Sequence, residues 1–160
     1  MDSFLTWLQN LPIFTAIAES SSVWAYPTVL MLHTAGLGWL VGLNTVVNLR
    51  LLGVGKRVPF DMLESLFPQM MWGFWLNLVS GVILFCLDAE HRVHQWMFWA
   101  KLAFIALALV NLRLTRLYMF RGTEFPRLDP VPAKGRAYAW MSLVLWWGAT
   151  AAGRLTAYVG

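Results

Sequence analysis

Residues 24–53, WAYPTVLMLHTAGLGWLVGLNTVVNLRLLG, decide the fold class. A helix needs about 20 mainly apolar residues to cross the hydrocarbon core of a bilayer, and this run is longer. Its interior holds one ionisable side chain, His33. An ionisable residue at membrane depth is energetically expensive and by default indicates a functional site. The other candidate residues are therefore judged by whether they lie near His33.

The composition of the whole chain is that of an integral membrane protein. Of its 160 residues, 59% are hydrophobic and only 12% are charged, whereas a soluble domain carries about a quarter charged residues. The net charge of +4 does not indicate nucleic-acid binding, because most basic residues fall between the apolar segments. The single cysteine, Cys86, excludes an intrachain disulfide and a paired-cysteine metal or haem-attachment site.

Four apolar segments predict an all-α, integral membrane four-helix bundle that forms one domain over residues 1–160. A short helix over residues 2–18, broken at Pro12, is expected to lie in the membrane interface. The expected spans cover residues of about 23–49, 70–87, 96–118 and 137–158.

Two stripes of small residues predict close helix contacts. Gly38 and Gly42 form a GxxxG pattern, and Gly73 and Gly81 share a face in the second span. Such residues let helix backbones approach closely in a membrane. Besides the lipid bilayer, the expected partners are therefore a second copy of the chain or other subunits of a membrane complex.

The basic residues predict the orientation. Two loops and their adjoining helix ends hold nine of them, and the opposite side holds three. The positive-inside rule places the richer side in the cytoplasm and both termini in the periplasm of a bacterial inner membrane. The nine are Arg50, Lys56, Arg57, Arg113, Arg116, Arg121, Arg127, Lys134 and Arg136.

In this orientation four candidate ligand-binding residues fall in the outer half: His33, His94, Lys101 and Arg154. One hypothesis is a b-type haem held by His33 and His94, with Lys101 and Arg154 near its propionates. His94 is expected to lie several residues shallower than His33, which disfavours a bis-histidine pair. The same two histidines are the candidate metal ligands.

A second hypothesis is a quinone or small-anion site, in which Lys101 and Arg154 bind the ligand oxygens and His33 is the hydrogen-bond or proton partner. Either ligand would make the chain a small electron-transfer or redox-anchor protein. A non-enzymatic structural subunit is the alternative, with His33 bonded only to Asn77, Ser80 or a backbone carbonyl of a neighbouring helix. A small-solute or metal carrier is a third possibility.

The sequence contains no nucleophile elbow, phosphate loop, HExxH motif or paired-carboxylate constellation, so no catalytic residue is predicted and enzymatic activity stays open. No carboxylate falls within a predicted span. This absence disfavours a proton-coupled transporter that depends on an intramembrane acid.

Four segments resemble a family of small bacterial four-span membrane proteins that has no assigned activity. They are HTAGLG at 33–38, NLRLLG at 48–53, FWAKL at 98–102 and AAGRLTAY at 151–158. The resemblance implies the four-span architecture and a bacterial origin. It also places His33, Lys101 and Arg154 within the recurring segments.

Overall fold

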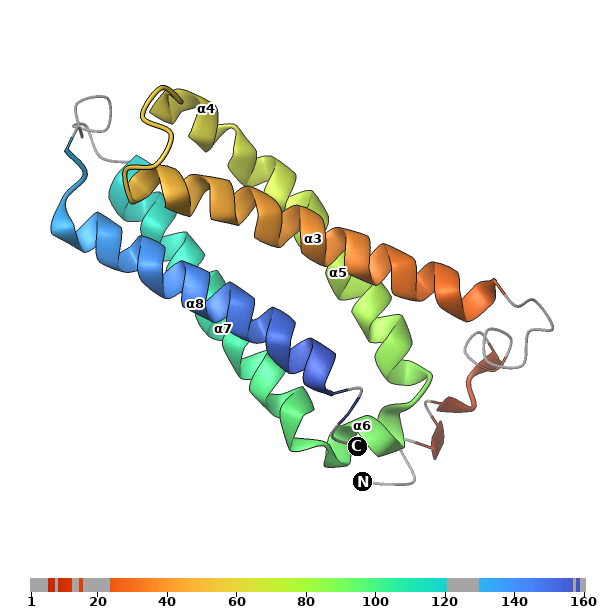
Figure 1. The fold of residues 1–160 in the computed structure, drawn as a ribbon. Coiled ribbons are helices and arrows are strands. Elements are labelled where there is room, and N and C mark those ends of the chain that lie inside the picture. Colours follow the sequence, from red (N-terminus) through yellow and green to blue (C-terminus); the bar gives the residue numbers. More distant parts are fainter. Residues whose placement is uncertain are drawn as a thin grey trace.

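The computed structural model describes residues 6, 7, 9–12, 15, 24–120, 130–156 and 158. The described residues are all-helical, and no strand occurs among them (Figure 1). Most of the expected interfacial helix over 2–18 lies outside the described residues. The long helices are α3 (Ala25–Leu51), α5 (Leu66–Cys86), α7 (Trp96–Thr115) and α8 (Ala133–Leu155), and the shorter elements are α4 (Phe60–Glu64), α6 (Ala89–His94) and the π-helix η1 (Arg116–Phe120).

Within the described residues, three segments are long and apolar enough to cross a membrane, as expected of a membrane protein: Ala25–Leu51, Phe60–Cys86 and Trp96–Phe120. Helix α8 is not among them. It is 23 residues long but carries Lys134, Arg136 and Arg154 near its ends, together with several glycines and alanines of low hydropathy.

Helices α5 and α8 begin about four residues earlier than the apolar pattern predicted, at Leu66 and Ala133. In both cases a proline accounts for the difference. Pro68 lies in the first turn of α5, where a missing N–H loses no intrahelical hydrogen bond, and Pro132 directly precedes α8. These prolines therefore belong to helix starts rather than to the preceding loops.

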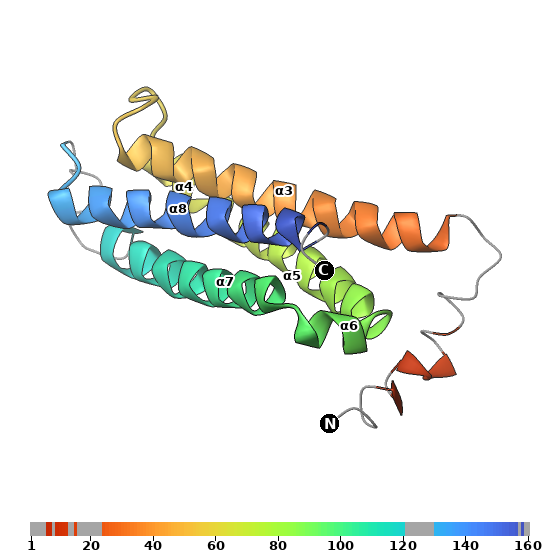
Figure 2. The same cartoon turned by 60° about the horizontal axis from the view of Figure 1, so that its bottom comes forward.

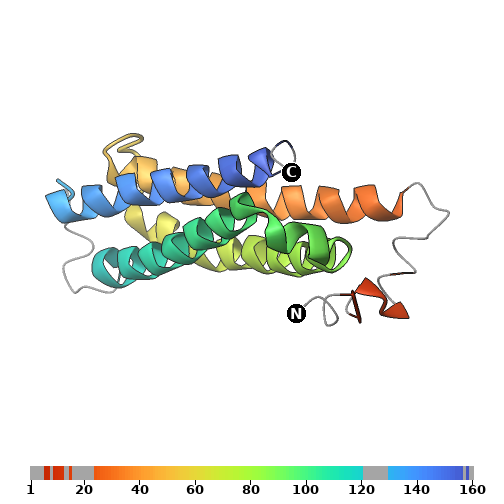
Figure 3. The same cartoon turned by 90° about the horizontal axis from the view of Figure 1, so that it is seen from below.

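The helices pack mainly as two pairs, α3 with α5 and α7 with α8, and the pairs meet through α3 and α8. Figure 2 shows α8 lying between α3 and α7. In Figure 3 the first turns of α3 extend beyond the C-terminal end of α8. The two pairs are thus closely joined along one side only.

The α3–α5 contact depends on Gly36 and Gly73. A Cβ atom added at Gly36 would lie 2.9 Å from the Gly73 carbonyl oxygen, and one added at Gly73 would lie 3.0 Å from the Gly36 carbonyl oxygen. Gly38 and Gly42 are not used in this contact, because no described atom lies within 4 Å of a Cβ at either position, and their predicted contact with a second copy or another subunit stays a prediction. The GxxxG face is left open because α3 turns the neighbouring Gly36 toward α5.

A buried polar network joins α3 to α8 midway along their contact. The Ser142 hydroxyl oxygen accepts hydrogen bonds from Asn44 Nδ2 at 3.0 Å and from Asn48 Nδ2 at 2.9 Å. All three side chains are at most 1% exposed. Hydrogen bonds among buried groups are costly to break, because a separated partner stays unsatisfied. The network therefore fixes the level at which the two helix pairs meet.

Candidate functional site

His33 bonds to α5 through one edge of its ring. Its Nδ1 lies 3.0 Å from the Asn77 carbonyl oxygen and 3.2 Å from Ser80 Oγ. A carbonyl oxygen can only accept a hydrogen bond. Nδ1 therefore carries the ring proton and donates a hydrogen bond to the Asn77 carbonyl oxygen. The Asn77 side-chain amide in turn donates to the His33 carbonyl oxygen at 2.8 Å. The backbone carbonyl of Asn77 and the Ser80 hydroxyl are among the partners that the structural-subunit alternative named for His33.

Gly81 supplies the space that the imidazole occupies. A Cβ atom added at this position would lie 3.0 Å from His33 Cε1 and 3.3 Å from His33 Nδ1. Any side chain larger than glycine would therefore press on the ring. Gly81 and Gly73 were predicted to form one helix-contact stripe, and both are used within the chain, Gly73 against a backbone and Gly81 against His33.

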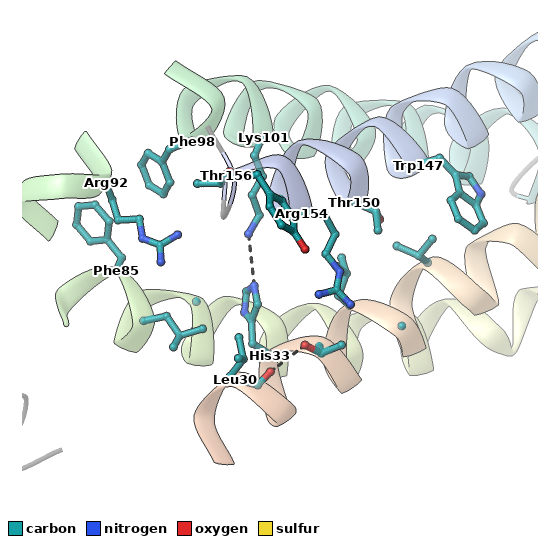
Figure 4. Close-up of a pocket in the computed structure, with 18 of the residues that line it drawn as sticks. Leu30, His33, Phe85, Arg92, Phe98, Lys101, Trp147, Thr150, Arg154 and Thr156 are labelled. Atoms are coloured by element: carbon teal, nitrogen blue, oxygen red, sulfur yellow. Dashed lines mark hydrogen bonds between the residues drawn. The ribbon is translucent and has the colours of Figure 1, made fainter. Parts of the chain in front are cut away.

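The other edge of the imidazole faces Lys101 of α7. Lys101 Nζ lies 3.4 Å from His33 Nε2 (Figure 4). Because Nδ1 holds the ring proton, Nε2 is free to accept a hydrogen bond from the ammonium group. The Lys101 stem passes Gly153 of α8, where an added Cβ would lie 3.5 Å from its Cδ and Cε atoms. His33 therefore links α5 to α7, through two different ring nitrogens.

A cavity of about 650 Å³ opens beside this pair, between the two helix pairs. Arg92, Lys101 and Arg154 line it, and Figure 4 shows their side chains converging on the space above His33. Arg92 also bonds Asp88 at 3.2 Å. No aspartate or glutamate occurs among the described lining residues. The chemistry of the cavity mouth therefore favours a ligand with acceptor oxygens or negative charge.

Apart from Tyr26 and Tyr158, the rest of the cavity wall is apolar or carries small side chains. Trp147 and Thr150 of α8 form part of it, opposite a stripe of α3. Trp147 and Arg154 are seven residues apart on α8, and both line the cavity. The stripe of α3 consists of Leu30, Thr34, Leu37, Gly38, Val41, Gly42 and Thr45.

The cavity brings together three of the four predicted ligand-binding residues. His33, Lys101 and Arg154 line it, whereas His94 is an exposed residue of α6 and is not among the lining residues. No group of three or more His, Cys, Asp or Glu side chains that could hold a metal ion occurs in the described parts of the chain.

Sequence reasoning missed two kinds of contributor to this site. Gly81 and Gly153 matter for the room that they leave, which only the partner helix reveals. Arg92 was not among the candidate ligand-binding residues but lines the cavity from α6. The reach of Lys101 was also missed, because its long side chain brings the ammonium group to the imidazole.

Comparison with protein-family models, with curated proteins and with solved structures finds no match to this chain. The resemblance to small bacterial four-span proteins therefore stays a prediction. Function must be inferred from the cavity itself.

Proposed function

We propose that this chain is a small redox protein of the bacterial inner membrane that binds the head group of a quinone in the outer half of the bilayer. In this proposal α8 is the fourth span of the bundle and both termini face the periplasm. The apolar character of α3, α5 and α7, the packing of α8 along two of them and the uneven distribution of basic residues support this arrangement.

The observation that carries the proposal is the Lys101–His33 pair at the cavity wall. The ammonium group has three N–H donors, and His33 Nε2 accepts one of them. Two donors are left for a ligand carbonyl, and the Arg154 guanidinium lines the same space. A quinone offers two acceptor oxygens on a flat apolar ring, which suits a cavity with donors at one end and apolar walls. The volume of about 650 Å³ is also within the usual range for small-molecule sites.

The residues present fit a haem less well than a quinone. An iron ligand must present a free ring nitrogen, and Lys101 Nζ lies 3.4 Å from the only one that His33 has left. His94, the proposed second ligand, is not among the residues that line the cavity. A haem would require Lys101 to withdraw from His33 and a second ligand to come from elsewhere.

A structural subunit is the competing proposal, and the Nδ1 edge of His33 favours it. This edge bonds α5 at two points and would stabilise the helix pair without any ligand. The two proposals depend on opposite edges of the His33 ring, the structural role on Nδ1 and ligand binding on Nε2. A structural role requires only Asn77 and Ser80, whereas ligand binding also requires Lys101. A solute or metal carrier would instead show uptake that depends on His33.

Organic extraction of the purified protein tests the proposal. We expect about one quinone per chain, and a reduced-minus-oxidised spectrum with no Soret band. Lys101→Met keeps an unbranched stem one atom shorter and removes the donors, so its bound quinone should fall about tenfold or more, as expected when a charged hydrogen bond is lost.

Lys134→Met is the matched control, because Lys134 lies at the start of α8 with its Nζ 4.7 Å from the Tyr118 ring centroid. This variant should keep its quinone. A quinone-free wild-type protein of full stability would favour the structural subunit, and a Soret band that His33→Ala removes would favour haem.

A further inference from the structure

The cavity is longer than a quinone head group. Its lining along α3 includes His33 and continues to Thr45, twelve residues further on. At the helical rise of about 1.5 Å per residue, this part of the wall is about 18 Å long. The cations Arg92, Lys101 and Arg154 lie at the end where α8 stops, and none of the described residues that line the wall from Gly38 to Thr45 is charged. The cavity is therefore polar at the end lined by the three cations and apolar at the end that lies along α3 from Gly38 to Thr45.

The apolar end is open because two glycines of α3 face it. No atom of the described residues lies within 4 Å of a Cβ atom at Gly38 or at Gly42, although both residues line the cavity. Trp147 of α8 stands on the other wall, and its side chain is 58% exposed. The open stretch ends at the level of Thr45, next to Asn44, where the Ser142 network joins α3 to α8.

We infer that this cavity takes a quinone together with its isoprenoid chain, the head group against Lys101 and Arg154 and the chain along α3 past Gly38 and Gly42. The inference rests on the proposed function and names the class of quinone, one that carries a long apolar chain. The charged residues fix the orientation of the quinone in the cavity, because the described donors for the head group, Lys101 and Arg154, lie at one end. The apolar end continues the same cavity, so chain and head group occupy one site.

The role of the glycines in this arrangement is steric. The chain exchanges one apolar environment for another when it leaves the bilayer, so its burial gives little hydrophobic gain. The apolar end of the cavity, which we call the groove, instead leaves room for the isoprenoid chain, so that the chain does not prevent the head group from binding. A side chain placed at Gly42 should therefore weaken binding of a chain-bearing quinone by about tenfold or more and leave a tailless quinone unaffected.

Photo-crosslinking tests the inference. The probe is a quinone with a diazirine on its isoprenoid chain, added to the full-length protein in lipid nanodiscs. We expect labels on the lining residues Gly38, Val41, Gly42 and Thr45 of α3 and on Trp147, and we expect an excess of tailless quinone to suppress them. Gly42→Leu should lose these labels and retain tailless-quinone binding, and its new Cβ meets no described atom within 4 Å. Ala35→Leu, an exposed position of α3 outside the cavity lining, is the control and should keep the labels.

Three results would overturn the inference. In the first, labels spread over exposed residues such as Trp39 and Val46, and tailless quinone binds but does not suppress them. This result would show that the isoprenoid chain lies outside the groove, and it would leave the head-group site intact. A wild-type dimer that Gly42→Leu dissociates would assign the groove to a second copy of the chain. Failure of the tailless quinone to bind the wild-type protein would refute the proposed function, and the inference with it.

Discussion

The room that Gly81 leaves for His33 can be tested by filling it with a single methyl group. In Gly81→Ala the new Cβ would lie 3.0 Å from His33 Cε1. The ring cannot retreat freely, because its two nitrogens contact Asn77 and Lys101 at 3.0 and 3.4 Å. Overpacking of this kind costs about 1–3 kcal/mol, whereas replacing glycine by alanine within a helix gains about 1 kcal/mol.

Gly42→Ala serves as the reference, because it has the same gain in helix propensity and no clash. The difference in the free energy of unfolding between the two variants therefore isolates the contact with His33. We expect Gly81→Ala to be less stable than Gly42→Ala by about 1–3 kcal/mol, measured by denaturant titration in one detergent. Gly81→Ala should also bind quinone more weakly. Equal stability of the two variants would refute the packing of His33 against Gly81.

Two further variants test other parts of the structure. Ser142→Ala removes the hydroxyl shared by Asn44 and Asn48 and should lower the free energy of unfolding by about 1–3 kcal/mol. Ser65→Ala, at an exposed position, is its control. An unchanged unfolding curve for Ser142→Ala would contradict the role of the network. Arg154→Gln should weaken binding of tailless quinone without changing the unfolding curve, because the side chain lines the cavity and is exposed; unchanged affinity would exclude Arg154 from the head-group site.

The sequence predicted the helices because their signal is local. Long apolar runs and breakers such as Gly53 mark them, and α3 extends over Ala25–Leu51 where residues 23–49 were expected. The partners of His33 on α5 were also predictable. Few polar side chains occur in the apolar runs, and Asn77 and Ser80 are two of them.

The pairing of helix faces was not predictable in the same way. Gly36 and Gly38 are two residues apart, and the GxxxG pattern singled out Gly38, yet in the described parts of the chain Gly36 is the one of the two that meets another helix. The reach of side chains was likewise hidden. Counting residues along the backbone places Lys101 closer to the outer membrane surface than His33. The flexible lysine stem spans this difference in depth, and its ammonium group sets the chemistry of the cavity.

Equilibrium titration of the nanodisc-embedded protein with a tailless quinone tests the central claim most directly. We expect saturable binding to a single site in the wild type and a dissociation constant about tenfold higher or more in Lys101→Met, since the ammonium donors are lost. Non-saturable uptake, identical in the two proteins, would reflect partition into lipid and would contradict a quinone site beside His33 and Lys101.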